Sequence, residues 1–174
     1  MIDLNSNPVV LIETSMGNIK VKIYEDKAPI TAFNFLRYVD AGLYDGTSFF
    51  RTVTLDNQPN DNVKIEVIQG GQVPEEKEYE PINLERTTLT GLKHLDGTIS
   101  MGRFKPDSAT SSFFFCIGDQ PELDYKGKRN SDGQGFAAFG KVIEGMNVVR
   151  KIQKMPHEGQ KLTPPILITK ISRV

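Results

Sequence analysis

A series of short strand-forming segments, separated by loops that contain glycine or proline, most constrains how this chain can fold. Residues 9–14 and 19–24 flank a Ser-Met-Gly-Asn turn and predict an N-terminal β-hairpin. Six further segments have the length and composition of strands: 48–53, 63–69, 98–103, 111–117, 136–142 and 165–173. Eight strands with few helices favour a closed barrel or a sandwich over alternating βαβ units.

Only two segments have the periodicity of an amphipathic helix. The first begins at Pro29, which the first turn of a helix tolerates, and ends near Gly42. The second is predicted over residues 144–154, with Pro156 just beyond its end. The apolar stripe of the first helix is Ala32, Phe35, Leu36 and Val39. We therefore expect a mainly β fold with two α-helices.

The length of 174 residues predicts one domain. A chain of this size buries roughly 70% of its unfolded surface, so it can form a core without covalent links. The single cysteine, Cys116, excludes an intramolecular disulfide. Lys and Arg number 21 against 22 Asp and Glu, and this balance argues against a broad nucleic-acid interface.

No segment has the roughly 20 consecutive apolar residues that a membrane-spanning helix needs. The first eight residues contain neither the basic nor the apolar region of a secretory signal. We therefore expect no membrane association. The expected location is cytoplasmic, or periplasmic if a signal was removed.

Motifs for metal, nucleophilic or phosphate chemistry are missing from the sequence. The two histidines, His94 and His157, lack metal-ligand spacing, and neither a Gly-x-Ser-x-Gly elbow nor a Walker loop occurs. We interpret His94 and the nearby Asp96 as a solvated loop pair. Cys116 lies in an aromatic segment, which is typical of an inert core thiol. The basic cluster at 126–129 is interpreted as a solvated loop.

Three of the predicted strands carry the most informative side chains. Because successive side chains of a strand alternate between faces, residues two apart share a face. The sets predicted to share a face are Phe49, Arg51 and Val53; Val67 and Gln69; and Ser112, Phe114 and Cys116, with Phe113 and Phe115 opposite the last set. The third strand is therefore aromatic on both faces. One face can fill a barrel core, and the other must be covered or form a surface pocket.

These segments, with several others, resemble the cyclophilin family of peptidyl-prolyl cis–trans isomerases, particularly its bacterial members. They are similar, in the same order, to the family motifs Phe-His-Arg, Gln-Gly-Gly, Met-Ala-Arg, Ser-Gln-Phe-Phe, Leu-Asp and Phe-Gly-Lys-Val. The matching segments are Ala28-Pro29, Phe49-Phe50-Arg51, Gln69-Gly70-Gly71, Met101-Gly102-Arg103, Ser111-Ser112-Phe113-Phe114, Leu123-Asp124, Phe139-Gly140-Lys141-Val142 and Glu144-Gly145-Met146. The resemblance runs from about Val9 to Val174. It implies an eight-stranded antiparallel closed β-barrel capped by two α-helices.

The resemblance also implies an activity: isomerisation of X–Pro bonds in proline-containing polypeptides, which assists protein folding and needs no cofactor or metal. It implies that Arg51 is the catalytic cation, and that Gln69 holds either this arginine or the substrate carbonyl. The residues that it assigns to substrate binding are Phe50, Val67, Gly102, Arg103, Ser112, Phe114, Glu122, Leu123 and Phe136. The alternative is a cyclophilin-like peptide-binding or holdase module with little turnover. A third and weaker alternative is a β-barrel scaffold whose surface loops bind a protein partner.

Five positions depart from the family pattern. Phe50 replaces His, Glu66 replaces Phe, Gly102 replaces Ala, Ser112 replaces Gln, and Glu122 stands where many members have Trp or Phe. A carboxylate at position 122 offers no indole donor and would be costly to desolvate, so we expect weak binding of cyclosporin-type ligands.

The domain is expected to span residues 1–174 as a monomer, with residues 1–8 as an N-terminal extension. Residues 55–62 form an insertion between the segments that carry Arg51 and Gln69. The insertion is polar and lacks apolar periodicity, so we expect a mobile surface loop that tunes substrate choice and does no chemistry.

Overall fold

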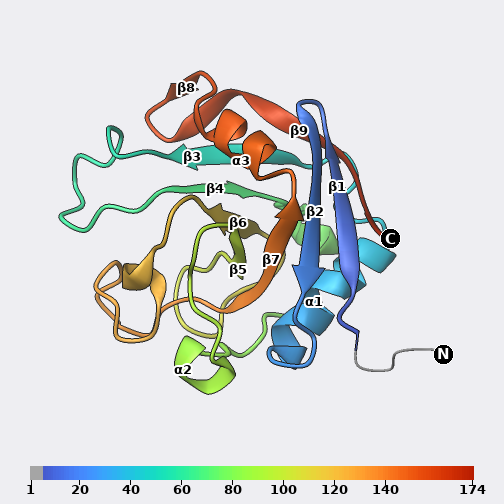
Figure 1. The fold of residues 1–174 in the computed structure, drawn as a ribbon, viewed down its shortest axis with the longest axis horizontal. Coiled ribbons are helices and arrows are strands. Elements are labelled where there is room, and N and C mark those ends of the chain that lie inside the picture. Colours follow the sequence, from blue (N-terminus) through green and yellow to red (C-terminus); the bar gives the residue numbers. More distant parts are fainter. Residues whose placement is uncertain (1–5) are drawn as a thin grey trace.

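The computed structural model describes residues 6–174 and consists mainly of one antiparallel sheet that closes on itself (Figure 1). The barrel strands are β1 (Val9–Thr14), β2 (Gly17–Ile23), β3 (Ser48–Val53), β4 (Val67–Gly70), β5 (Thr98–Met101), β6 (Phe113–Cys116), β7 (Ala138–Glu144) and β9 (Lys161–Arg173). Their order around the barrel is β1-β2-β7-β5-β6-β4-β3-β9, and β9 pairs again with β1. The predicted eight-stranded barrel is confirmed. A two-residue strand, β8 (His157–Glu158), pairs with the start of β9 and was not predicted.

Several strand boundaries differ from the predicted ones. The predicted strand at 63–69 pairs only over Val67–Gly70, because the backbone of Ile65 bonds to the amide group of Gln58 and not to a neighbouring strand. Conversely, β9 begins at Lys161, before the predicted start at residue 165. Apolar alternation thus located each strand, whereas pairing with its neighbours sets its ends.

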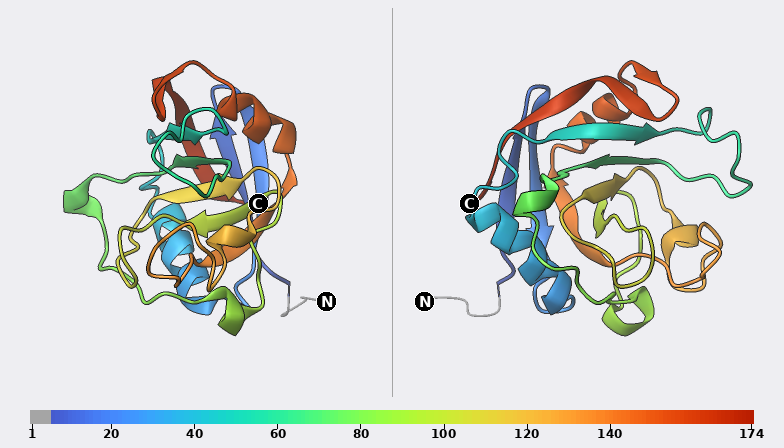
Figure 2. Two further views of the ribbon diagram at one scale, coloured as in Figure 1. Left: turned by 90° about the vertical axis from the view of Figure 1, so that its left-hand side faces the viewer. Right: turned by 180° about the vertical axis from the view of Figure 1, so that it is seen from behind.

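The helices α1 (Pro29–Asp40) and α3 (Met146–Gln153) lie at opposite ends of the barrel (Figures 1 and 2). The first matches its predicted range. The second begins two residues later than predicted, because Glu144 ends β7 and Gly145 turns the chain with a φ of 94°. Three short elements were not predicted: α2 (Thr87–Thr90) and the 3-10 turns η1 (Glu75–Lys77) and η2 (Pro121–Leu123).

The barrel interior is a hydrophobic core with an aromatic centre. Phe113 of β6 makes edge-to-face contacts with Phe35 of α1, Tyr44 and Phe49, at centroid separations of 5.4–6.0 Å. Gly71 has a φ of 75°, and a side chain there would strike the ring of Phe113. The core therefore constrains both the aromatic residues and the backbone around them.

A second hydrophobic cluster lies on the outer face of the barrel. Its buried members are Val53, Ile65, Val67, Phe114, Cys116 and Leu123, with Phe136 packed against them. Strand β6 contributes to both clusters, since Phe113 and Phe115 point inward whereas Phe114 and Cys116 point outward. The prediction that this strand is apolar on both faces is confirmed.

A break in the alternation of β3 separates Phe49 from Arg51. The pairing of β3 with β4 and with β9 shifts register between these two residues. Phe49 consequently lies in the barrel core, while Val53 belongs to the outer cluster. The prediction that Phe49, Arg51 and Val53 share one face is wrong for Phe49, because the bulge changes the phase of the strand.

The predicted N-terminal extension, residues 1–8, falls partly outside the described residues, which begin at position 6. The carbonyl of Pro8 accepts a hydrogen bond from the backbone of Ile23, so the described part of the extension adjoins the first hairpin. None of the helices within residues 6–174 is both long enough and apolar enough to cross a bilayer.

The core predicts a large difference between two phenylalanine substitutions. Replacing Phe113 by alanine should lower the free energy of unfolding by about 3–5 kcal/mol, because it leaves a cavity among packed rings. Phe33 of α1, which is 64% exposed, is the matched control, and its replacement by alanine should change stability by less than about 0.5 kcal/mol. Denaturant unfolding measures both. Similar values for the two variants would contradict this assignment of the core.

Candidate functional site

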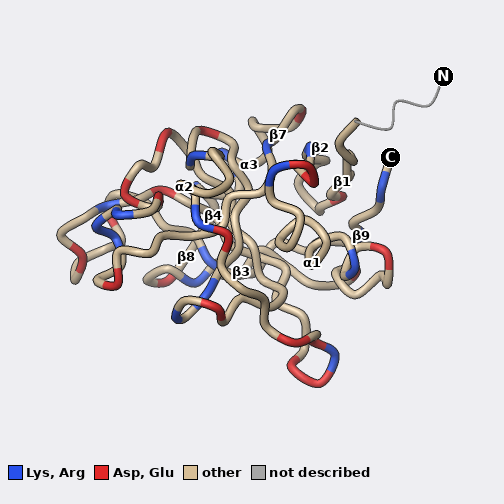
Figure 3. Tube along the Cα trace, turned by 90° about the horizontal axis from the view of Figure 1, so that it is seen from below, with Lys and Arg blue, Asp and Glu red and all other residues tan. Residues whose placement is uncertain are grey.

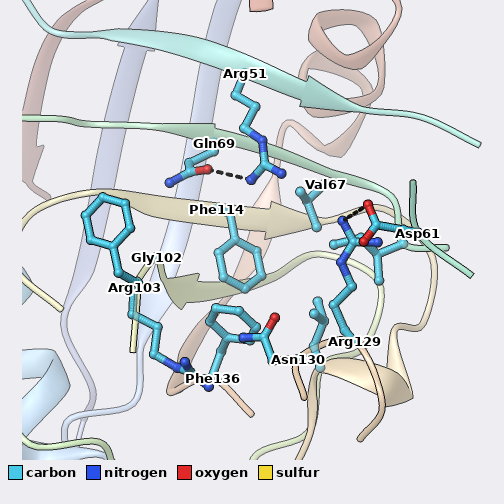
Figure 4. Close-up of a pocket in the computed structure, with 13 residues that line it drawn as sticks. Arg51, Asp61, Val67, Gln69, Gly102, Arg103, Phe114, Arg129, Asn130 and Phe136 are labelled. Carbon is cyan, nitrogen blue, oxygen red and sulfur yellow. Dashed lines mark hydrogen bonds and ion pairs between the residues drawn. The ribbon is translucent and has the colours of Figure 1, made fainter. Parts of the chain in front are cut away.

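A pocket of about 460 Å³ opens on the outer face of the barrel, over β3, β4 and β6. Two long connections border it: the β3–β4 loop, residues 54–66, and the loop of residues 124–137 before β7 (Figures 1 and 4). The lining residues are Arg51, Asp61, Ile65, Val67, Gln69, Gly102, Arg103, Phe104, Phe114, Leu123, Arg129, Asn130 and Phe136. Eight of the eleven residues predicted for the site are therefore brought together in one pocket.

Two glutamine side chains fix the guanidinium of Arg51 at one wall of the pocket. Its Nη1 donates to Oε1 of Gln69 at 3.0 Å, and its Nε and Nη2 donate to Oε1 of Gln160 at 2.9 and 2.8 Å. In the described part of the chain no carboxylate forms an ion pair with Arg51. Burial, together with the charge of Arg129, lowers the pKa of Arg51, yet an arginine stays protonated at neutral pH. The positive charge is held rigidly and is not neutralised by a neighbour.

Gln69 is itself oriented by Ser112. Its Nε2 donates to the hydroxyl of Ser112 at 3.0 Å. A side chain at position 102 would lie 2.7 Å from that hydroxyl and 2.8 Å from Nε2 of Gln69. The serine and the glycine that depart from the cyclophilin pattern are thus coupled, because a methyl group at position 102 would displace the side chains of Ser112 and Gln69.

The floor of the pocket is apolar. Phe114 and Phe136 meet edge to face at 5.3 Å, and Val67 and Leu123 pack beside them in the outer cluster. Phe114 is 5% exposed. These side chains leave a slot suited to a small apolar ring.

His94 supports this floor from beneath. Its ring is stacked on Phe114 with centroids 6.0 Å apart, and it lies 2.7 Å from the carboxylate of Asp124 and 2.9 Å from the hydroxyl of Ser100. The interpretation of His94 as a solvated pair with Asp96 is therefore wrong. His94 is buried, and its partner lies thirty residues away, where sequence proximity does not indicate it.

Arg103 connects the wall of the pocket opposite Asp61 and Arg129 to the loop before β7. Its guanidinium donates to the carbonyl of Gly135 and to both carboxylate oxygens of Asp132, and lies 4.7 Å from the ring centroid of Phe136. These hydrogen bonds lower the pKa of Asp132. Arg103 therefore positions Phe136, in addition to lining the pocket.

The β3–β4 loop is anchored and takes part in the pocket. Gln58 is buried, and its amide binds the backbone of Thr54 and Ile65. Asn57 accepts, through its carbonyl, a hydrogen bond from Nε2 of Gln160, the same side chain that holds Arg51. Most of residues 55–62 are exposed, whereas the burial of Gln58 differs from the surface position expected for the insertion.

Arg129 joins the two bordering loops. Its guanidinium donates to Oε1 of Gln58 and to the carbonyl of Val63, and it forms an ion pair with Asp61 at 3.3 Å. Its side chain is only 9% exposed. The side chain of Arg129 is thus largely shielded from solvent, so the interpretation of the basic cluster as a solvated loop is wrong for this residue. Its partners lie far away in the sequence, where a local pattern does not indicate them.

Three residues predicted to bind substrate do not line the pocket. Phe50 is half-buried beside the bulge, and Ser112 lies behind Gln69. The carboxylate of Glu122 accepts a hydrogen bond from the backbone of Lys128, so this side chain organises a loop. Each position was assigned from its place in a family motif, and at all three the residue differs from the one that the family carries.

The lining residues that sequence reasoning missed are Asp61, Ile65, Phe104, Arg129 and Asn130. The period-two spacing of Ile65 with Val67 and Gln69 could have identified Ile65. The others lie in polar loops without local signals.

Cys116 is buried, and burial raises the pKa of its thiol, in agreement with the predicted inert role. Residues 6–174 contain no group of three or more His, Cys, Asp or Glu side chains placed to hold a metal ion.

Comparison with known proteins points to one family. Residues 9–173 match the family described as cyclophilin type peptidyl-prolyl cis-trans isomerase/CLD. A peptidyl-prolyl cis-trans isomerase of Acinetobacter baylyi is 39% identical over 156 residues, which cover 87% of this chain and 74% of that protein. Peptidyl-prolyl cis-trans isomerase B of Escherichia coli is 35% identical over 150 residues, covering 83% and 84% of the two chains.

A solved structure shows the same fold. The cyclophilin type peptidyl-prolyl cis-trans isomerase of Cryptosporidium parvum aligns over 97% of this chain and 98% of its own, with a TM-score of 0.76 and 24% identity. A second structure of that protein, determined in the presence of the dipeptide ala-pro, aligns with a TM-score of 0.72.

The contacts of His94 predict that it stabilises the pocket floor. Replacing His94 by alanine removes a ring stacked on Phe114 and takes away a partner of Asp124 and Ser100, so the free energy of unfolding should fall by about 2–4 kcal/mol. The matched control is His157→Ala, because His157 is exposed and should contribute less than about 0.5 kcal/mol. Chemical denaturation measures both, and a loss below about 1 kcal/mol for His94→Ala would show that the floor does not depend on this ring.

Proposed function

The chain belongs to the family of cyclophilin-type peptidyl-prolyl cis–trans isomerases and accelerates rotation about X–Pro peptide bonds, and we propose that Arg51 is the catalytic residue. The observation that carries this proposal is the unneutralised guanidinium of Arg51 beside an apolar slot. Two glutamine oxygens hold it, and no carboxylate of the described chain pairs with it.

The chemistry of the reaction explains why such a cation is useful. Rotation about the peptide bond breaks C–N resonance and crosses a barrier of about 18–20 kcal/mol. In the twisted state the proline nitrogen becomes pyramidal and basic, so a donor aimed at this nitrogen binds the transition state more strongly than either planar isomer. Because Gln69 and Gln160 hold Arg51 in place, little reorganisation is required when the amide twists.

We assign the proline ring to the apolar slot formed by Val67, Phe114, Leu123 and Phe136. A ring of five members fits against the edge-to-face pair of Phe114 and Phe136 without requiring a polar partner. The presence of ala-pro in a structure of the Cryptosporidium parvum relative supports proline-containing peptides as the substrate class.

We assign the residue before proline to the wall formed by Gly102 and Arg103. Gly102 is half-buried and lines the pocket, so its backbone is within reach of a bound peptide. In Figure 4 this wall lies across the pocket from Asp61 and Arg129, with Phe114 and Phe136 between them. A bound peptide therefore runs from Gly102 across the floor toward Arg129.

Substitution of Arg51 tests the proposed mechanism. Arg51→Ala should lower kcat/KM for an Ala-Pro peptide on the order of a hundredfold, because loss of one transition-state donor costs about 3 kcal/mol. The matched control is Arg173→Ala, which removes an exposed arginine paired with Asp40 and should leave the rate near the wild-type value. A folded Arg51→Ala protein with the wild-type rate would exclude Arg51 as the catalytic cation.

Cyclosporin-type macrocycles are predicted to inhibit weakly. The wall that such an apolar ligand would contact carries Asp61, whose side chain is 41% exposed and would lose hydration when covered. Titration of the peptide assay with the macrocycle should therefore require a large excess over enzyme. Stoichiometric inhibition at low enzyme concentration would contradict this prediction.

A further inference from the structure

We propose that the pocket selects peptides with an acidic side chain after the proline, and that Asp61 and Arg129 set this preference. The inference rests on the proposed function, because it uses the same pocket and the peptide direction assigned above. It concerns two segments that border the pocket: the 55–62 insertion, which carries Asp61, and the loop that carries Arg129.

Arg129 is built into the pocket wall. Its Nη1 donates to the side chain of Gln58 and to the backbone of Val63, at 2.8 and 2.7 Å. Its Nη2 lies 3.3 Å from Asp61, and its Nε takes no part in these bonds. The backbone carbonyl and the amide oxygen keep the guanidinium in place whether or not Asp61 remains its partner.

The charges that face the pocket are unbalanced. Arg51 and Arg129 both line it, and their mutual repulsion contributes to the lowered pKa of Arg51. Asp132 already neutralises Arg103, so Asp61 is the one lining carboxylate, among the residues the structure describes, that faces the two other arginines. A second carboxylate placed between Arg51 and Arg129 would therefore be attracted by both.

Asp61 is suited to give up its place to a substrate. Its side chain is 41% exposed, so Asp61 can turn toward water, and a substrate carboxylate that replaces it restores the ion pair of Arg129. A glutamate or aspartate of the substrate can then occupy the position of Asp61 against Arg129. Asp61 in this arrangement competes with acidic substrates for the same guanidinium.

The position along the peptide follows from the layout of the pocket. Gly102 and Arg103 form one wall and Asp61 and Arg129 the opposite one (Figure 4). With the residue before proline at Gly102, the residue after proline reaches Arg129.

Figure 3 shows basic and acidic residues interspersed along the chain, and the formal net charge is −1. A preference for substrates with an acidic side chain would therefore come from Asp61 and Arg129 in the pocket, and not from the electrostatic potential of the whole protein.

The test measures kcat/KM for three peptides, Ala-Ala-Pro-Glu, Ala-Ala-Pro-Gln and Ala-Ala-Pro-Lys. The wild-type protein should favour the glutamate peptide over the lysine peptide by about fivefold at low salt, and the ratio should shrink as salt is raised. The ratio within each variant is compared, so a general change in activity cancels. Asp61→Asn should increase the ratio, because the competing carboxylate is lost.

Arg129→Gln should bring the ratio toward one, and Arg129→Lys should retain most of it, since the charge remains. The matched controls are Asp40→Asn and Arg173→Gln, an exposed pair outside the pocket, which should leave the ratio unchanged. Opposite shifts for Asp61→Asn and Arg129→Gln are a signature that loss of folding does not produce.

Two different failures are distinguishable. If the wild-type protein isomerises the neutral glutamine peptide but shows no preference between glutamate and lysine, the inferred specificity is overturned while the proposed function stands. A lower ratio of kcat/KM for the glutamate peptide over the lysine peptide in Asp61→Asn than in the wild-type protein would also overturn the inferred specificity. If none of the three peptides is isomerised, the proposed function itself fails.

Discussion

Phe113 and Phe114 are adjacent in β6, yet their rings belong to two separate hydrophobic clusters. The first fills the barrel, where it contacts aromatic rings from α1 and β3. The second forms the floor of the pocket on the outer face. Because one four-residue strand is buried on both sides, the pocket floor is fixed by the same backbone that fixes the core. The rest of the site is arranged around this rigid strand.

The position of Arg51 depends on contacts between distant parts of the chain. A bulge in β3 turns Phe49 into the core and leaves Arg51 at the pocket. Glutamines from β4 and from the β8–β9 turn then hold its guanidinium, and Ser112 orients the first of them. Amide oxygens as partners satisfy its donors without cancelling its charge, which is the property that electrostatic stabilisation of a twisted amide requires.

The barrel, both main helices and most of the lining residues could be predicted, because alternation, helical stripes and short motifs are local properties of the sequence. The bulge at Phe49, the burial of His94 and the role of Arg129 could not. Each depends on a partner far along the chain, as when Arg129 binds Gln58 seventy-one residues away. Phe50, Ser112 and Glu122, which were predicted to bind substrate, do not line the pocket, and a matched motif does not show the contacts that Ser112 and Glu122 make instead.

The closure of the barrel between its first and last strands has a consequence for biosynthesis. Strand β9 pairs with β1 and with β3, so the outer edges of both remain open until the chain has been made through Arg173. An open strand edge can pair with other chains. A chain that has not yet been made as far as β9 therefore lacks the partner of both edges. The slow, non-local pairing of β9 is the step that removes them, and after it the barrel no longer offers these edges for aggregation.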